Sequence, residues 1–158
     1  SPFKGGKVFV EAMQEVAVKN PSKQWSVTLV GNGDLALPHE SNLFFKKLWM
    51  SSQTDLISEY DSADLLVIPS SFDNFPTVAI EAQLRGLPVL GTRVGGIPEI
   101  LDNGQAGFLC NPDSLSIAKA IISLTPEMLN KVGKCAFERA QLSYSHTKIK
   151  LEYLKVLL

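Results

Sequence analysis

Short apolar runs alternate with helical patterns along most of this chain. Between residues 6 and 19, apolar side chains recur every three or four positions, and Pro21 closes the segment, which predicts an amphipathic helix. The next run, 25–30, is rich in β-branched and apolar residues and stops at the turn residues 31–34, which predicts a strand. The run 65–68 is continuously apolar, as expected of a strand that is covered on both faces.

The rest of the chain continues this alternation. Further strands are predicted at 43–48, 88–90 and 107–109, and further helices at 54–60, 77–85, 98–101, 115–122, 126–141 and 149–157. Because parallel neighbouring strands need crossover connections, this order predicts an α/β fold with a mainly parallel sheet and helices on both faces. Ligands of such sheets bind beyond the carboxyl ends of the strands, which here are the loops 31–34, 70–77 and 92–99.

Composition and charge narrow the classes of function. The chain has 158 residues, 45% of them hydrophobic and 20% charged, which indicates one globular domain. Its 15 Lys and Arg nearly balance 16 Asp and Glu, so no basic field exists to hold nucleic acid or an anionic membrane. No apolar run reaches the roughly 18 residues of a transmembrane helix, and no signal peptide is evident. We therefore expect a cytoplasmic protein with no nucleic-acid partner and no transmembrane segment.

Cysteine and histidine offer little chemistry. Cys110 and Cys135 are too few for a disulfide framework and lack metal-ligand spacing, so both are expected to be reduced packing residues. His39 is expected to be solvated in a loop, and packing is the simpler role for His146. Neither a cofactor nor a metal is expected. The turn-like opening at residues 1–6 would normally follow another element, which suggests a fragment of a longer protein.

Two glycine-containing loops have more than one interpretation. The run 31–34 is similar to the start of a dinucleotide-binding turn, but Pro38 stands where that motif requires a helix, so NAD and FAD are not expected. A tight turn and a loop that admits a ligand both remain possible there. Gly95 and Gly96 suit either a tight turn or a phosphate, and Glu99 is either a first-turn acid favoured by the helix dipole or a ligand contact.

The segment 69–82, with the sequence PSSFDNFPTVAIEA, carries the most chemistry. It joins a buried strand to a helix, with Asp73 or Asn74 expected at the helix cap and Pro76 just inside the helix. Glu81 lies among apolar neighbours, where a carboxylate must find hydrogen-bond donors or face solvent. Hydroxyls of a sugar or ribose are such donors, and free N–H groups at a helix start favour a phosphate. Two interpretations remain: a polyol phosphate ligand, or a solvent-facing Glu81.

These residues, in this order, resemble the signature of a known family. Asp73 and Glu81 are followed by Gly-Leu-Pro-Val at 86–89 and by Gly-Gly-Ile-Pro-Glu-Ile at 95–100, and the match extends back to Lys4 and forward through residue 109. The pattern is similar to that of the retaining GT-B glycosyltransferases of family 4. The resemblance implies an α/β, Rossmann-like parallel sheet flanked by helices, which is one half of a GT-B fold. Residues 1–158 would be the C-terminal, nucleotide-sugar-binding domain, without the N-terminal acceptor domain.

The resemblance also implies roles for individual residues. Glu81 corresponds to the acid that holds the ribose hydroxyls. Asp73, where the family usually has Glu, corresponds to the acid that faces hydroxyls of the donor sugar. Lys4 corresponds to the basic residue that neutralises the diphosphate leaving group. The remaining donor-binding positions are Gly33 in the glycine-containing turn and the backbone amides of Asn74, Phe75 and Thr77.

The implied function is transfer of a hexosyl group from a nucleoside diphosphate sugar to a glycan or lipid-linked acceptor, with retention of configuration and without a cofactor. Since the cleft of such an enzyme lies between two domains, this chain alone is expected to bind the donor and not to catalyse. Its partners would be the donor, the N-terminal domain and the acceptor, in the cytoplasm or at the inner face of a membrane. The alternatives are a non-catalytic nucleotide-sugar sensing module and a GT-B epimerase or phosphorylase.

Overall fold

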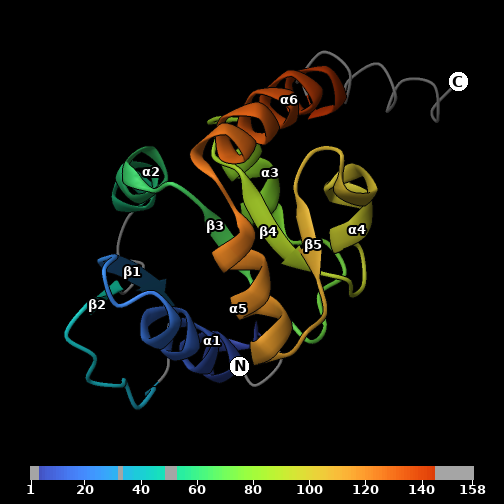
Figure 1. Ribbon diagram of the computed structural model, residues 1–158. Coiled ribbons are helices and arrows are strands. Elements are labelled where there is room, and N and C mark those ends of the chain that lie inside the picture. Colours follow the sequence, from blue (N-terminus) through green and yellow to red (C-terminus); the bar gives the residue numbers. More distant parts are fainter. Residues whose placement is uncertain (1–3, 32–33, 49–52, 145–158) are drawn as a thin grey trace, which may run out of the picture.

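The computed structural model describes residues 4–31, 34–48 and 53–144, and Figure 1 shows the arrangement of the elements. The predicted helix at 149–157, His146 and Gly33 lie outside these residues. The helices are α1 (Gly6–Lys19), α2 (Gln53–Ser62), α3 (Thr77–Gln83), α4 (Ile97–Ile100), the 3₁₀ turn η2 (Asp102–Gly104), α5 (Ser114–Ser123) and α6 (Pro126–Tyr144). The strands are β1 (Trp25–Val30), β2 (Leu43–Leu48), β3 (Leu66–Ile68), β4 (Val89–Thr92) and β5 (Phe108–Cys110). The order of elements predicted from the sequence is confirmed throughout the described residues.

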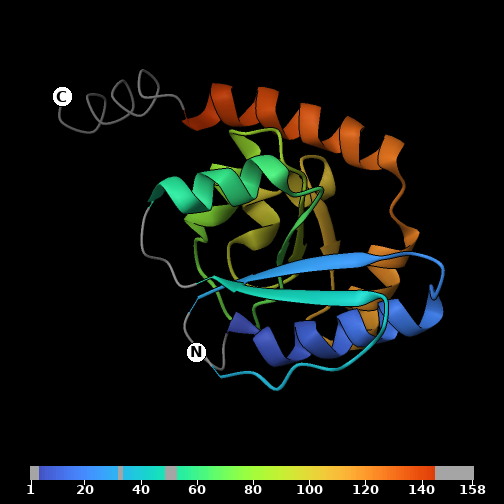
Figure 2. The same ribbon diagram turned by 90° about the vertical axis from the view of Figure 1, so that its left-hand side faces the viewer.

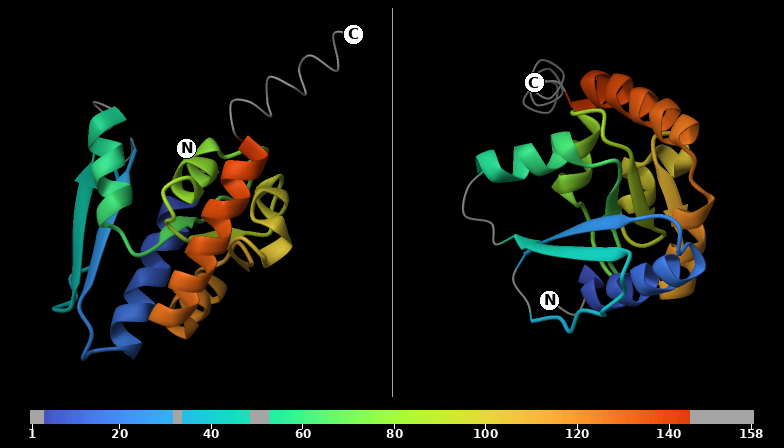
Figure 3. Two further views of the ribbon diagram at one scale, coloured as in Figure 1. Left: turned by 90° about the horizontal axis from the view of Figure 1, so that it is seen from above. Right: turned by 60° about the vertical axis from the view of Figure 1, so that its left-hand side comes forward.

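The strands pair in parallel but fall into two sheets. In the smaller sheet β1 pairs with β2, from Trp25 opposite Leu43 to Val30 opposite Leu48. In the larger sheet β4 lies between β3 and β5. The parallel pairing is as predicted, whereas the division into two sheets is not, because an apolar run indicates a strand without indicating its neighbour. Helix α2 connects the sheets and lies between the smaller sheet and α3 (Figures 2 and 3).

Helices cover both faces of the larger sheet, and β4 shows why. All four of its residues are buried, and successive side chains point to opposite faces. Leu90 belongs to a core cluster with α1 and α5, which pack against each other, and Val89 belongs to a second cluster with α2, α3 and α4. Strands buried on both faces need helices on both sides, so the predicted three-layer arrangement is confirmed.

The two cysteines differ in their environments. Cys110 is buried at the end of β5, where its Sγ lies 3.7 Å from the carbonyl oxygen of Gly91, and burial raises the pKa of its thiol to about 11. Its packing role is therefore confirmed. The same prediction for Cys135 is wrong, because that residue is exposed. Helix α6 buries small residues, among them Gly133 and Ala136, and Cys135 lies off that face.

Replacement of Gly133 by Ala should destabilise the protein, although Ala normally favours a helix interior by about 0.5–1 kcal/mol. A Cβ at this position would lie 2.4 Å from the backbone oxygen of Gly86, so α6 would have to move away from the turn after α3. We expect a loss of about 1–3 kcal/mol in the free energy of unfolding, as for overpacked cores. Urea titration of Gly133→Ala measures this loss of stability. Lys134→Ala, at an exposed position of the same helix, is the control. Equal or greater stability of the glycine variant would contradict the close packing.

Candidate functional site

The loops after β3 and β4 meet at the carboxyl end of the larger sheet. The Thr92 hydroxyl, at the end of β4, donates a hydrogen bond of 2.6 Å to the backbone oxygen of Ser70, which follows β3. Both residues are buried. The Ser70 hydroxyl in turn donates to Oδ2 of Asp73 over 3.4 Å. A buried polar network therefore fixes the start of the segment that carries the predicted site.

Lys4 and Asp73 form an ion pair in this loop region, with 2.6 Å between Nζ and Oδ2. The side chain of Asp73 is only 11% exposed, whereas that of Lys4 is 63% exposed. The contact depends on Gly5, which has a φ of +70° and approaches Pro69 so closely that a Cβ would lie 1.8 Å from the Pro69 oxygen. The structure thus brings together two of the residues assigned to the donor site, although 69 positions separate them in sequence.

The expected capping of α3 by Asp73 or Asn74 is wrong. The helix begins at Thr77, its cap residue is Pro76, and no side chain makes a cap hydrogen bond there. Asp73 lies too early in the chain to reach the first turn, and its carboxylate is engaged with Lys4 and Ser70 instead. The backbone amides of Asn74, Phe75 and Thr77 lie in this exposed segment, and their contact with a ligand stays a prediction.

Gly95 and Gly96 pack against the backbone of the same segment. A Cβ on Gly95 would lie 1.9 Å from the oxygen of Asp73, and one on Gly96 would lie 1.9 Å from the oxygen of Asn74. The Gly96 N–H donates to the Asp73 oxygen over 3.1 Å. These glycines therefore allow two loops of the protein to lie close together. Their contact with a phosphate stays a prediction.

Glu81 is exposed on α3, and it has a protein partner that sequence reasoning missed. The hydroxyl of Tyr60, in the last turn of α2, donates to Oε2 of Glu81 over 3.1 Å. Tyr60 is 7% exposed, and burial together with the negative charge of Glu81 raises its pKa well above the usual value near 10. Solvent exposure of Glu81 is confirmed, and its role toward ribose stays a prediction. The sequence placed both residues on helices but could not show that the two helices adjoin.

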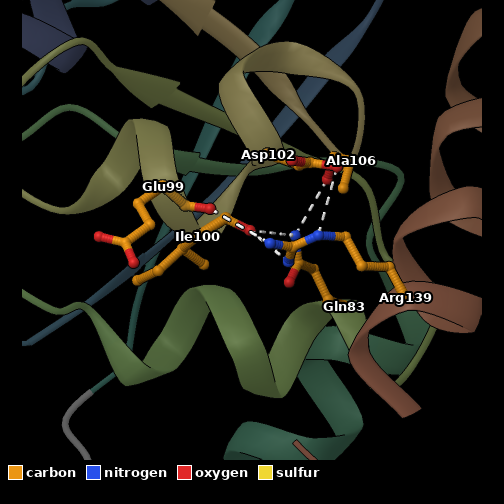
Figure 4. Close-up of polar contacts among 6 residues, drawn as sticks. All are labelled: Gln83, Glu99, Ile100, Asp102, Ala106 and Arg139. Atoms are coloured by element: carbon orange, nitrogen blue, oxygen red, sulfur yellow. Dashed lines mark hydrogen bonds and ion pairs between the residues drawn. The ribbon is translucent and has the colours of Figure 1, made fainter. Parts of the chain in front are cut away.

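A second polar cluster joins α3 and α6 to the backbone around α4 (Figure 4). Buried Gln83 donates through Nε2 to the oxygens of Ile100 (3.3 Å) and Ala106 (3.0 Å). Arg139 donates to the oxygen of Ile100 over 3.1 Å, and its Nε lies 3.5 Å from a carboxylate oxygen of Asp102. These side chains satisfy the carbonyls at the end of a helix of only four residues. The cluster thereby fixes the loop that contains Gly95 and Gly96 relative to α3.

The remaining candidates are a histidine, an acid at the start of α4 and two glycines of the turn after β1. His39 is exposed, which confirms that it is solvated. Glu99 lies in the first turn of α4 with an exposed side chain, which agrees with a first-turn acid. Gly31 has a φ of +127°, as a turn requires, but Gly33 lies outside the described residues, so its contact with a donor stays a prediction.

A cavity of about 780 Å³ lies at the opposite end of the strands from these loops. Residues that precede β1, β3 and β4 line it, among them Lys23, Asp64 and Pro88. Lys4, Asp73 and Glu81 do not contribute to it. The carboxyl-end loops are the better candidate for the functional site, because ligands of open parallel sheets bind at that end.

Comparison with known proteins supplies the family. Residues 1–126 match the family described as glycosyl transferases group 1. The chain belongs to this family. It is 29% identical to the D-inositol 3-phosphate glycosyltransferase of Corynebacterium glutamicum strain R over 168 aligned residues, which cover 97% of the chain and 40% of that relative. The chain therefore spans less than half of the length of this curated glycosyltransferase.

Several solved structures have the same fold. One is the C-terminal domain of a group 1 glycosyl transferase from Francisella tularensis, at 22% identity and a TM-score of 0.76, with 92% of this chain and 82% of that chain covered. Another is HepE from Anabaena in complex with UDP-glucose, at 21% identity and a TM-score of 0.78, with 99% and 46% covered. The fold is thus the Rossmann-like half of a GT-B fold, as expected. Among the described residues, no helix has the length and apolar character needed to cross a membrane.

The stability of this glycosyl transferase domain should fall more steeply than usual at alkaline pH, because of Tyr60. The folded protein retains the phenol proton above pH 10, where the unfolded chain loses it. The unfolded state then binds fewer protons, so the free energy of unfolding decreases as the pH rises past about 10, whereas below that pH Tyr60 causes no change of stability with pH. Denaturant titrations between pH 8 and 11 measure this slope. In Tyr60→Phe the decline should be shallower, and an identical decline in both proteins would contradict the raised pKa.

Proposed function

We propose that this chain is the donor-binding half of a retaining, family 4 glycosyltransferase that moves a hexosyl group from a nucleoside diphosphate sugar to a glycan or lipid-linked acceptor. The observation that carries the proposal is the ion pair between Lys4, which precedes α1, and Asp73 in the loop after β3, with Glu81 exposed on the next helix. A cation and two carboxylates on one edge of a parallel sheet match the three parts of such a donor: diphosphate, sugar and ribose.

Lys4 is suited to the diphosphate because its side chain is 63% exposed, so a ligand with two negative charges can reach the ammonium group. Charge on the diphosphate grows as the glycosidic bond breaks, and a cation beside it stabilises that charge. Lys4 would therefore contribute both to donor binding and to departure of the leaving group.

Asp73 is suited to the sugar for the complementary reason. When Lys4 turns to the diphosphate, the carboxylate keeps the hydrogen bond from Ser70 but loses its cationic partner. A carboxylate that is 11% exposed then needs other donors, because unpaired charge is costly at such a depth. Sugar hydroxyls can supply them. Binding of diphosphate and sugar would thus be coupled through one ion pair.

Transfer would require a second domain that provides the acceptor side of the cleft. Support comes from the length comparison, since the chain covers 40% of its relative from Corynebacterium glutamicum. Positioning of two reactants can lower a barrier by about 7–11 kcal/mol, and one domain cannot supply this. An assay of sugar transfer by a longer protein that contains a second domain separates this proposal from the sensing module. A transferase should turn over the donor, whereas a sensing module should bind the same donor without turnover.

Replacement of Lys4 by Gln should weaken binding of nucleoside diphosphates more than that of the nucleosides. A charge-assisted contact contributes about 1.5–3 kcal/mol, so we expect roughly a tenfold or larger loss for the diphosphate. Calorimetric titration with UDP, GDP, ADP and CDP, each beside its nucleoside, measures the effect. Lys7→Gln, an exposed position in the first turn of α1, is the matched control for the loss of one positive charge. Equal affinities of Lys4→Gln and Lys7→Gln for the diphosphate would exclude Lys4 from the site.

Replacement of Glu81 by Gln should weaken binding of the same diphosphates, because an amide accepts through only one oxygen where a carboxylate accepts through two. The folded state should be retained, since the side chain is exposed. We expect roughly a tenfold loss of affinity, with little change in the urea midpoint. Unchanged affinity in the folded variant would remove Glu81 from the ribose site.

A further inference from the structure

Three successive residues in the last turn of α2 connect this helix to different parts of the molecule. Glu59 accepts a hydrogen bond of 2.9 Å from Thr28 on β1 and forms an ion pair with Lys46 on β2. Asp61 accepts two hydrogen bonds of 2.6 Å from Arg85, just beyond α3, and these hold the pKa of Asp61 below its usual value. The end of α2 is therefore fixed against both the smaller sheet and α3, as its position in Figures 2 and 3 shows.

Tyr60 lies between Glu59 and Asp61 in the sequence and is more buried than either of them. Its ring is part of the core cluster that contains Ile68, Ala79 and Ala82, and only 7% of the residue is exposed. A buried aromatic ring has few conformations, so its hydroxyl has a fixed position. The hydroxyl also stays protonated, because burial raises the pKa of Tyr60. It is thus a constant hydrogen-bond donor toward Glu81.

Glu81 gains an orientation from this contact that its own helix does not provide. An exposed glutamate samples several rotamers, and ordering it costs conformational entropy when a ligand binds. The Tyr60 hydroxyl engages Oε2, which directs the plane of the carboxylate. In the part of the chain that the structure describes, no side chain other than Tyr60 is hydrogen-bonded to this carboxylate. Oε1 and a lone pair of Oε2 therefore remain for hydroxyls on neighbouring carbons.

We propose that Tyr60 is a positioning residue that orients the Glu81 carboxylate toward both hydroxyls of the ribose and so sets the preference of the site for ribose over 2′-deoxyribose. The proposal rests on the proposed role of Glu81. It adds a residue of α2 to a site otherwise formed by the loops and by α3. Preorganisation of the Glu81 carboxylate improves affinity, because binding then no longer has to order this side chain. The gain applies only to ligands whose hydroxyls bind both carboxylate oxygens.

The experiment compares two ligands in five proteins: the wild type, Tyr60→Phe, Glu81→Gln, the double variant of these two and the control Asp61→Asn. The ligands are the tightest-binding of UDP, GDP, ADP and CDP and the 2′-deoxy form of the same nucleotide. The wild-type domain should bind the ribonucleotide at least about tenfold more tightly, as loss of a hydrogen bond to a charged acceptor predicts. In Tyr60→Phe this ratio should fall to about threefold or less, mainly through weaker ribonucleotide binding. Glu81→Gln should show a similarly small ratio, and the double variant should lower it no further.

Asp61→Asn is the matched control, because it weakens the neighbouring attachment of α2 to Arg85 without altering Tyr60 or Glu81. It should keep the wild-type ratio. A wild-type ratio in Tyr60→Phe would overturn the proposal while leaving the role of Glu81 intact. An equally reduced ratio in Asp61→Asn would overturn it too, since general loosening of α2 would then explain the effect. A wild-type protein without any preference for ribose would remove the ribose role of Glu81, and the proposal with it.

Discussion

Contact between backbone segments without intervening side chains is the constraint on which the site depends. Gly5 lies against the oxygen of Pro69, and Gly95 and Gly96 lie against the backbone of Asp73 and Asn74. Any Cβ at these three glycines would lie within 2 Å of a backbone oxygen, so no other residue fits without movement of a loop. Three segments that are distant in sequence therefore meet at one edge of the larger sheet. Their meeting, more than any single side chain, places Lys4 beside Asp73.

The two carboxylates of the candidate site each have a partner within the protein, and this determines how they respond to a ligand. Asp73 is neutralised by Lys4 and hydrogen-bonded by Ser70, and Glu81 receives a hydrogen bond from Tyr60. The contacts of Asp73 offset the cost of holding a carboxylate that is only 11% exposed. All these contacts also give the carboxylates defined positions before any ligand arrives. A ligand with a diphosphate would exchange one partner for another instead of desolvating a free charge, which keeps the cost of binding low.

The core explains why the site can depend on short loops and short helices. Strand β4 buries side chains toward both faces, and α1 with α5 on one side and α3 with α4 on the other cover them. Gln83 and Arg139 then attach α3 and α6 to the backbone that follows α4. Because α3 and α4 have seven and four residues, their positions depend on these tertiary contacts more than on helical propensity.

The sequence by itself determined the order of the elements and predicted which loops form the candidate site. Periodicity, Gly, Pro and turn residues act over a few positions, so the helices and strands could be read directly, and loops after parallel strands lie at one edge by topology. Only the tertiary structure decided that the strands form two sheets, that Cys135 is exposed, and that Asp73 binds Lys4 and does not cap α3. It also decided the partner of Glu81. Lys4 and Asp73 are 69 positions apart and Tyr60 and Glu81 are 21 apart, and no local pattern encodes contacts over such separations, because they arise from the packing of whole elements.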